Sequence, residues 1–299
     1  MKRNRFICID IGGTAIKYGV LDSNGEIVLI RETPTYAIEG GPALAKRIYG
    51  LCEELLEEVS DIQGIAISSA GVVDTNRACI IHASDAIPNY AGTSFKDTLA
   101  PFGLPVEAEN DVNCAGLGEY VSGSAKNARL ALILTIGTGI GGCFIEDGRL
   151  LHGNSYSACE VGYLPFEEET FQDLASTSAL CRFVAERKGG QLDRWNGRRI
   201  FEESAKGDPI CQEEIERLGK RLGKGIAMLC YILNPQIVVL GGGIMSQEEK
   251  LRPWIEEGFK QASIPLIANS TTIRFASHQN AAGMKGALVH FLQKHPEQA

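Results

Sequence analysis

The stretch Glu109-Asn110-Asp111-Val112-Asn113 decides how the rest of this sequence is interpreted. Residues 104–108 before it predict a short strand, and residues 112–121 after it place small and apolar side chains at helical spacing. Asp111 is therefore expected near a helix N-terminus, where backbone N–H groups and the helix dipole favour the ionised carboxylate. Such an aspartate can orient a hydroxyl group and accept its proton. Simple capping of the helix by Asn110 or Asp111 explains the same residues equally directly.

Composition limits the classes of function. The chain has 299 residues, of which 44% are apolar, enough for two ordinary domains with full cores. Asp and Glu number 37 against 29 Lys and Arg, and no segment gathers the basic residues. We therefore expect no nucleic acid and no acidic membrane as the main partner. The nine cysteines are dispersed without a C-x-x-C pair, which is typical of buried thiols in a reducing compartment.

The N-terminal residues predict no targeting segment. Residues 1–5 are basic, but Asp10 interrupts the apolar run that follows them. No other apolar run approaches the length that spans a membrane. We expect a cytoplasmic protein.

The first glycine-rich turn lies close to the N-terminus. An apolar strand at residues 6–9 leads into Asp10-Ile11-Gly12-Gly13-Thr14, and a second strand at 16–21 and a third from Ile27 follow. Glycines at this turn let backbone N–H groups approach a ligand, while Thr14 and Lys17 add a hydroxyl and a cation that suit a phosphate. Many hairpins carry two glycines for turn geometry alone, so that alternative stays open.

The next elements complete an α/β half-domain. Residues 41–59 carry apolar side chains at helical spacing, and residues 65–67 form a buried strand that runs into Ser68-Ser69-Ala70-Gly71. Residues 72–102 are irregular in pattern. Within them, Asn89 either reaches a polar ligand or belongs to a plain connection.

The same order of elements then restarts. Residues 130–136 form an apolar strand, Gly137-Thr138-Gly139-Ile140-Gly141-Gly142 predicts a glycine-rich turn, and a strand at 143–145 precedes a hairpin turn at 146–148. We interpret this as an internal duplication of residues 6–30. Two such half-domains can place two phosphate-binding turns on opposite walls of one cleft.

Two other nucleotide-binding motifs fit poorly. Gly137, Gly139 and Gly142 match G-x-G-x-x-G, but a dinucleotide-binding motif requires a helix directly after the glycines, and a strand follows here. The sequence contains no G-x-x-x-x-G-K-[ST] motif of a P-loop.

The C-terminal half holds one further glycine cluster. A polar loop at 151–164 contains Glu160 and Tyr163, and helices are expected from residue 172 and from residue 209. A strand at 236–240 then runs into Gly241-Gly242-Gly243. Consecutive glycines allow a flat ring such as adenine to lie against the backbone, although a tight turn alone also explains them.

Five motifs in this order resemble the ROK family of sugar kinases, within the actin and hexokinase superfamily. They are the turn at 10–14, the acidic stretch at 109–111, the turn at 136–142, Glu160-Val161-Gly162, and the glycines at 241–243, and the likeness extends to Asn280-Ala281-Ala282-Gly283. The resemblance implies an α/β fold of two similar ribonuclease H-like, actin-like ATPase lobes around a central cleft. Each lobe would contain a mixed five-stranded sheet. The lobes would be residues 1–115 plus about 285–299, and residues 116–284.

The resemblance also implies roles for individual residues. Asp111 would be the catalytic base, and Asp10 would hold Mg²⁺ through water. The ATP-binding residues would be Asp10, Gly12, Gly13, Thr14, Lys17, Thr138, Gly139, Gly241, Gly242 and Gly243. The sugar-binding residues would be Ser69, Gly71, Asn89, Asn110, Asp111, Glu160 and Gln172, with Asp173 as the alternative to Gln172.

One departure from the family concerns zinc. Typical members bind a structural zinc through the histidine of Glu-x-Gly-His and three cysteines of a C-x-C-G-x-x-G-C run. Here Tyr163 occupies the histidine position, and no cysteine lies between Cys159 and Cys181. We therefore predict no zinc site of that kind, so packing must hold the loop that carries Glu160.

By this resemblance the chain is an ATP-dependent, Mg²⁺-dependent kinase that phosphorylates the 6-hydroxyl of a hexose or N-acylhexosamine. The pattern is most similar to zinc-less N-acetylmannosamine kinases, with glucose as the other leading substrate, and a β-glucoside kinase is the alternative. A non-catalytic sugar-sensing regulator on the same fold and a nicotinamide oxidoreductase are the hypotheses from other classes. A homodimer is expected by analogy only.

Overall fold

The computed structural model describes residues 3–277 and 282–298 of the chain. Asn280 and Ala281 of the last motif therefore lie outside the described residues. The chain divides into two compact units. Unit 1 comprises Met1–Val121, His152–Ala158 and Asn280–Ala299, and unit 2 comprises Ser122–Leu151 and Cys159–Gln279.

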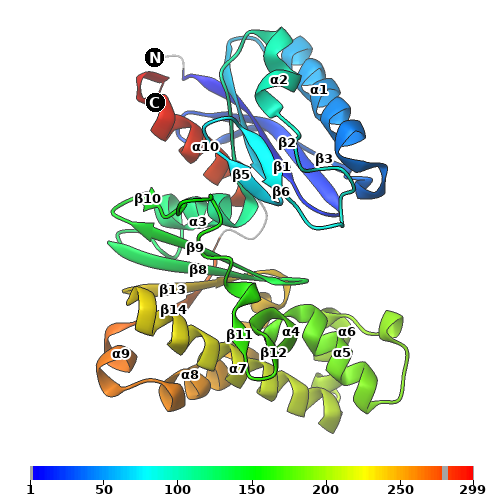
Figure 1. Cartoon of the computed structure of the whole chain (residues 1–299), viewed down its shortest axis with the longest axis vertical. Coiled ribbons are helices and arrows are strands. Elements are labelled where there is room, and N and C mark those ends of the chain that lie inside the picture. The colour runs from blue at the N-terminus through cyan, green and yellow to red at the C-terminus, as the bar shows by residue number, and fades with distance from the viewer. Residues whose placement is uncertain (1–2, 278–281, 299) are drawn as a thin grey trace. The chain divides into compact units, whose positions relative to one another are not determined.

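Unit 1 is built on a mixed five-stranded sheet with the order β3-β2-β1-β4-β7 (Figure 1). The three N-terminal strands form an antiparallel meander, and β4 and β7 extend it in parallel with β1. The strands are β1 (Arg5–Ile11), β2 (Ala15–Asp22), β3 (Ile27–Pro34), β4 (Ile62–Ser69) and β7 (Val106–Asn110).

Helices cover both faces of this sheet (Figure 1). Alternate β1 residues point to opposite faces, so Ile7 and Ile9 join the core with α1, whereas Phe6 and Cys8 join the core with α10. The Phe6 and Phe291 rings lie 5.2 Å apart between centroids. The helices of unit 1 are α1 (Gly40–Glu58), α2 (Phe95–Leu99), α3 (Asp111–Ser122, ending beyond the unit boundary) and α10 (Ala282–Lys294).

Unit 2 repeats the same sheet with the order β10-β9-β8-β13-β14. Here too an antiparallel meander is extended by two parallel strands. The strands are β8 (Leu130–Ile136), β9 (Ile140–Glu146), β10 (Arg149–Leu150), β13 (Ile237–Gly241) and β14 (Thr272–Phe275). The predicted fold class and the internal duplication are confirmed, because the two sheets share one order and one set of strand directions.

One large apolar core holds the helices of unit 2 against their sheet. The longest helix, α7, begins where the Asp208 side chain accepts a hydrogen bond from the Cys211 N–H, and it ends at Asn234 in the left-handed conformation. The helices are α4 (Phe171–Ala175), α5 (Thr177–Arg187), α6 (Gly197–Ala205), α7 (Pro209–Leu233), α8 (Glu248–Ala262) and α9 (Pro265–Ser270).

Three local expectations were wrong. Residues 72–102 are not irregular throughout, because β5 (Val72–Asp74) pairs with β6 (Cys79–His82) and α2 follows. The strand after the second glycine-rich turn begins at Ile140, so the turn itself is shorter than residues 137–142. The strand before Asp111 extends to Asn110 instead of ending at residue 108, because β7 pairs with β4 up to Ser69.

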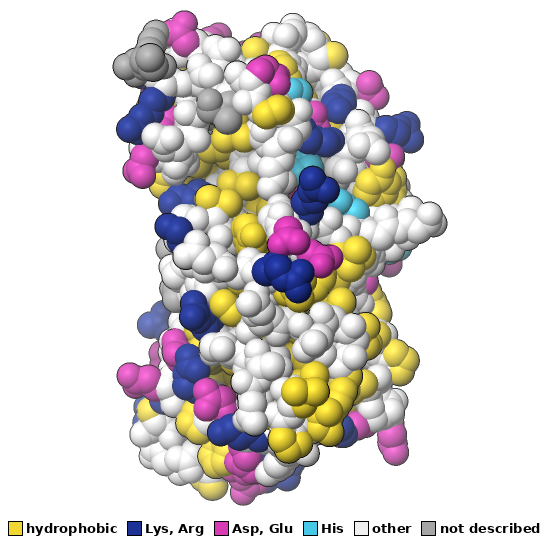
Figure 2. Space-filling model, turned by 90° about the vertical axis from the view of Figure 1, so that its left-hand side faces the viewer, with side chains coloured by type: hydrophobic (Ala, Val, Ile, Leu, Met, Phe, Trp, Pro, Cys, Tyr) yellow, Lys and Arg dark blue, Asp and Glu magenta, His cyan; other side chains and the backbone are white. Residues whose placement is uncertain are grey.

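The surface and the cysteines agree with the composition. On the face in Figure 2, Lys and Arg side chains alternate with Asp and Glu without a stripe of one sign. All nine cysteines are free, and all except Cys159 are buried. Among the described residues, no helix combines the length and apolar character needed to cross a bilayer.

Candidate functional site

The parallel strands of unit 1 bring three sequence motifs to one edge of the sheet. β1, β4 and β7 are neighbours, and their register pairs Asp10 with Ser68 and Ser69 with Asn110. The carboxyl ends of adjacent parallel strands meet at one edge, which is where ligands bind in open α/β sheets. Asp10, the turn at Gly71 and the Asn110-Asp111 pair therefore form one cluster.

Asn110 caps α3 and fixes Asp111. The Asn110 Oδ1 accepts hydrogen bonds from the N–H groups of Val112 at 2.9 Å and Asn113 at 3.1 Å. The Asn110 Nδ2 donates to Asp111 Oδ1 at 3.0 Å and to the Gly71 carbonyl at 3.0 Å. Asn110 is therefore the main cap of α3, and Asp111 Oδ1 accepts hydrogen bonds from both the Asn110 amide and the Val112 N–H, the second at 2.9 Å.

Asp10 occupies a confined position beneath this edge. The Ser68 hydroxyl donates to Asp10 Oδ1 at 2.6 Å. Burial raises the pKa of Asp10, and the Ser68 hydrogen bond and the Lys17 charge offset part of that rise. A Cβ at Gly283 of α10 would lie 2.4 Å from the Asp10 carboxyl carbon, so glycine is needed for this approach.

The predicted sugar residue Ser69 is fully buried. Its hydroxyl lies 2.6 Å from the Tyr90 hydroxyl, and neither side chain is more than 1% exposed. The Ser69 side chain therefore points into the core, and its role in sugar binding stays a prediction. Asn89, the residue before Tyr90, has a φ of 53°. Gly71 also has a positive φ, of 93°, and a Cβ there would lie 2.7 Å from the His82 carbonyl oxygen.

The first glycine-rich turn is tight, and Thr35, the residue after β3, braces it. The Gly12 N–H donates to the Ala15 carbonyl at 3.1 Å, and the Thr35 hydroxyl donates to the Gly12 carbonyl at 2.6 Å. Gly13 and Thr14 are exposed at its tip. Lys17 stands opposite Asp10 in the β1–β2 register.

Unit 2 contains a cavity of about 1030 Å³. Two of the predicted nucleotide-binding segments line it together, Gly137-Thr138 from the turn after β8 and Gly243 from the turn after β13. Glycine is needed at position 242 because the turn after β13 lies close to the end of β8. A Cβ at Gly242 would lie 2.1 Å from the Ile136 carbonyl oxygen. Gly241 is buried at the end of β13.

Most of the cavity wall was not identified from the sequence. The side chains that line it come from α5, α6, the segment before α6 and the start of α8, and they include Thr177, Cys181, Trp195, Asn196, Arg198, Phe201, Glu202, Gln247 and Lys250. The Asn196-Gly197 pair, in which Asn196 caps α6, was the one local signal at this position. The remaining side chains meet only through the packing of three helices.

Gln172 lies beside the second glycine-rich turn. Its Oε1 would lie 2.6 Å from a Cβ at Gly139 and 2.7 Å from a Cβ at Gly162. Gln172 therefore contacts both the turn after β8 and the loop that carries Glu160. Asp173 instead takes part in the cap of α4, where its carboxylate accepts the Thr170 hydroxyl at 2.5 Å.

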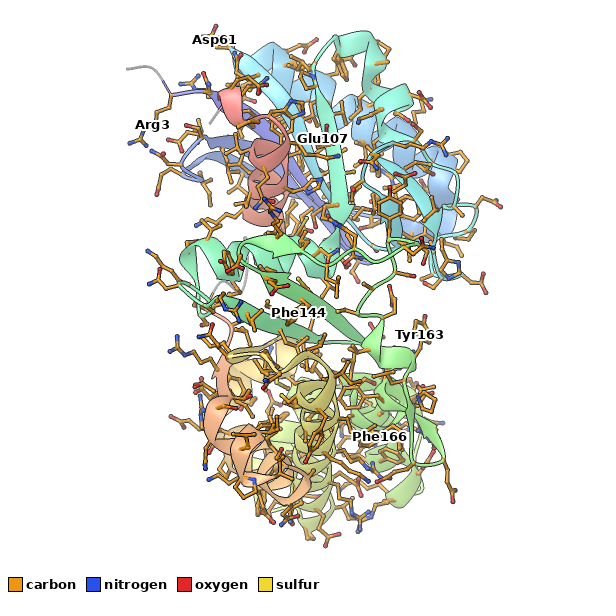
Figure 3. The ribbon with its side chains drawn as sticks, turned by 60° about the vertical axis from the view of Figure 1, so that its left-hand side comes forward. Arg3, Asp61, Glu107, Phe144, Tyr163 and Phe166 are labelled. Carbon is orange, nitrogen blue, oxygen red and sulfur yellow. The ribbon has the colours of Figure 1, made fainter. Side chains whose placement is uncertain are left out.

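Packing braces the loop that follows Glu160. Val161 is buried in the core of unit 2, and residues 165–170 close into the β11–β12 hairpin (Pro165–Phe166 and Glu169–Thr170). Tyr163, at the zinc-histidine position, is 61% exposed, and Phe166 is buried. Figure 3 labels both side chains. Within residues 3–277 and 282–298, no group of three His, Cys, Asp or Glu side chains gathers as for a metal. The absence of zinc stays a prediction.

Two mixed sheets of one topology, each covered by helices, define the actin-like ATPase fold of ROK proteins. The model of the ROK family matches residues 6–294, and this chain belongs to that family.

Relatives of this family cover nearly the whole chain. A beta-glucoside kinase of Listeria innocua is 34% identical over 97% of this chain and 98% of its own length. A ROK family protein from Streptococcus pneumoniae TIGR4, solved with sucrose, is 33% identical with a TM-score of 0.85, covering 98% of this chain and 99% of that one. A ROK family glucokinase from Streptomyces griseus, solved with glucose and AMPPNP, is 27% identical with a TM-score of 0.82, covering 95% and 98%.

Proposed function

We propose that this protein is an ATP-dependent kinase that phosphorylates the 6-hydroxyl of a hexose or N-acylhexosamine. The observation that carries the proposal is the position of Asp111 at the start of α3, held by Asn110 on the same sheet edge as Asp10. The kinases among the relatives support the same reaction class. Unit 1 would supply the first phosphate turn and the sugar-binding residues up to Asp111, and unit 2 the second phosphate turn, the adenosine site and the sugar-binding residues Glu160 and Gln172.

Asp111 would act by orientation more than by basicity. Phosphoryl transfer from ATP passes through a loose transition state with little bonding to the nucleophile, so a strong base is not required. The Asp111 carboxylate would accept the hydrogen of the sugar hydroxyl, align its oxygen with the γ-phosphorus, and take the proton late. The Asn110 hydrogen bond to Oδ1 leaves the direction of the carboxylate fixed during this step.

The cavity of unit 2 would bind the adenosine part of ATP. Its size suits a nucleoside. Because the Gly137 N–H already donates to the Gly139 carbonyl at 2.9 Å, Thr138 would supply the backbone N–H and hydroxyl that face the phosphates. Gln172 would join the turn at Gly139 to the sugar-binding loop of Glu160.

The residues present fit Mg²⁺ bound mainly through the phosphates. Asp10 offers a confined carboxylate at the phosphate turn, and Mg²⁺ favours one or two carboxylates together with waters and substrate phosphates. Bound there, the ion would neutralise developing phosphate charge. Burial raises the pKa of Asp10, so a nearby cation would also favour its ionised form.

The substrate alternatives differ in the sugar that is phosphorylated. The zinc-less pattern favours N-acetylmannosamine or glucose, whereas the Listeria relative supports a β-glucoside. A coupled assay of ADP release over glucose, mannose, fructose, N-acetylmannosamine, N-acetylglucosamine and cellobiose tests these directly. Sugar-dependent ADP release with one of them is expected. Sugar binding by calorimetry without ADP release would instead identify a non-catalytic sensor and overturn the proposal.

Two further features belong to the proposal. We expect a homodimer by analogy with the family, and we expect a cytoplasmic location. Light scattering on the purified protein measures the oligomeric state.

A further inference from the structure

Glu109 is a buried carboxylate directly beneath the Asn110-Asp111 pair. It is only 1% exposed and lies on the sheet face that α10 covers. Its Oε1 accepts the Asn110 N–H at 2.8 Å and the Asn113 Nδ2 at 2.9 Å. Its Oε2 accepts the His152 Nε2–H at 2.6 Å. Both oxygens of this carboxylate therefore accept hydrogen bonds, Oε1 from groups around α3 and Oε2 from His152.

Two histidines and an amide surround the buried Glu109 carboxylate. Burial opposes ionisation of Glu109, yet the His152 hydrogen bond, the nearby His290 and the Asn113 amide hold its pKa below the ordinary value. His290 Nδ1 of α10 lies 3.5 Å from Oε2, burial lowers the pKa of His290, and its Nε2 meets no partner among the described residues. At 2.6 Å, His152 is therefore the closer donor to Oε2.

His152 is also the first residue of a short segment, His152–Ala158, that belongs to unit 1. The chain before and after this segment belongs to unit 2. The segment His152–Ala158 is attached to unit 1 by polar contacts at two points. His152 bonds Glu109, and the Tyr156 hydroxyl accepts the Asn76 Nδ2 at 2.8 Å. Two residues beyond Ala158 the chain reaches Glu160.

We propose that the Glu109–His152 pair is a positioning device for Asp111. A continuous chain of hydrogen bonds runs from His152 through Glu109 and the Asn110 backbone to the Asn110 amide and Asp111. His152 fixes the rotamer of Glu109, and Glu109 fixes the junction between β7 and α3 that aims Asp111. This inference rests on the proposed kinase reaction. It adds two positioning residues that act through Asn110 and do not touch the substrate.

The chain supplies a matched pair for comparison. Glu107 is two residues earlier on the same face of β7, is also buried, and lies beside α10, as Figure 3 shows at its label. It pairs with His295 Nε2 at 3.1 Å and Lys294 Nζ at 2.9 Å. The Glu107–His295 pair thus repeats the chemistry of the Glu109–His152 pair, but it has no hydrogen bond to the Asn110 junction.

The experiment compares His152→Phe with His295→Phe and with His152→Gln. Removing the donor at His152 should lower kcat by about 10- to 100-fold, because small displacements of a catalytic group are costly, while KM for ATP stays unchanged. His152→Gln places an N–H donor near the position of Nε2 and should restore most of kcat. His295→Phe should lower the thermal midpoint and leave kcat near the wild-type value.

Hydrogen exchange provides a readout that does not depend on turnover. Amides of residues 110–113 and 153–158 should exchange faster in His152→Phe than in wild type, and stay protected in His295→Phe. Wild-type kcat in folded His152→Phe, or equal loss of kcat in both Phe variants, would overturn the inference. If the wild-type protein released no ADP with any sugar, only the kinase proposal would fail. Unchanged hydrogen exchange in His152→Phe would in that case still overturn the positioning role.

Discussion

The Nδ2 of Asn110 lies 3.0 Å from Oδ1 of Asp111, and the same Asn110 side chain caps α3 through its oxygen. One residue thus performs the capping, and the next presents a carboxylate from the first turn of the helix. The capping interpretation therefore applies mainly to Asn110, and the catalytic role of Asp111 stays a prediction.

Asp111→Asn tests the role of that carboxylate. An amide cannot take the proton of the sugar hydroxyl, so kcat should fall by about 100- to 10,000-fold while sugar binding is retained. Asp97→Asn, in the exposed first turn of α2, is the matched control and should leave kcat unchanged. Steady-state kinetics with calorimetric sugar binding measures both. Near-normal turnover in Asp111→Asn would refute the assignment.

Asp10→Asn should separate stability from activity. In the folded protein the pKa of Asp10 is raised above its ordinary value of 3.8. The free energy of unfolding therefore falls as the pH rises from 3.8 through the raised pKa. The neutral amide should therefore raise the unfolding midpoint at pH 7 and above, and lower kcat by about 100-fold or more through lost electrostatic stabilisation. Urea unfolding at pH 4–8 measures the first effect.

Asp22→Asn is the control of opposite sign. Burial opposes ionisation of Asp22, but Arg3 and two backbone N–H groups hold its pKa below the ordinary value. The ionised Asp22 carboxylate therefore adds to the free energy of unfolding at neutral pH, and this contribution is lost as the pH falls through the lowered pKa of Asp22. Asp22→Asn should therefore destabilise the protein at pH 7 without changing kcat. Equal stability changes in both variants would contradict this electrostatic account.

Gly283→Ala tests the approach of α10 to Asp10. The added methyl would lie 2.4 Å from the carboxyl carbon, so we expect a loss of about 1–3 kcal/mol in the free energy of unfolding and a lower kcat. Gly50→Ala, in the open surface of α1, should instead gain about 0.5–1 kcal/mol. Chemical denaturation compares the two. A neutral Gly283→Ala would mean that Asp10 moves freely.

Ala205→Trp tests the cavity of unit 2 as the adenosine site. Ala205 lines the cavity and is exposed, so an indole there should occupy the space of the base. KM for ATP should rise at least about tenfold, equivalent to about 1.4 kcal/mol of binding, with sugar affinity unchanged. The neighbouring Lys206→Trp, outside the cavity lining, is the control. Unchanged KM in Ala205→Trp would place the nucleotide elsewhere.

Local sequence signals were sufficient to predict those helices, strands and turns whose structure depends only on neighbouring residues. The meander from β1 to β3, its repetition from β8 to β10, and the limits of α7 follow from apolar periodicity, turn residues and caps. The repetition predicted that the two half-domains are alike, whereas the order and direction of their strands come from the structure. The junction at Asn110 was predictable for the same reason, since a cap involves only neighbours in the chain.

Contacts between distant segments were beyond such reasoning. Nothing near Ser69 in the sequence indicates that Tyr90 covers it, and nothing near Gly283 indicates the Asp10 carboxyl against it. The β5–β6 hairpin was missed because its strands are short and lack a clear alternation.

The sequence by itself determined the two repeated half-domains and the strand–helix junction that presents Asp111, because hydrophobic period and capping act over a few residues. Only the tertiary structure decided that Asp10 is confined by Ser68 and α10, that Trp195 and Gly243 line one cavity, and that His152 reaches Glu109. These contacts join residues far apart in the chain, so they depend on how whole helices and sheets pack.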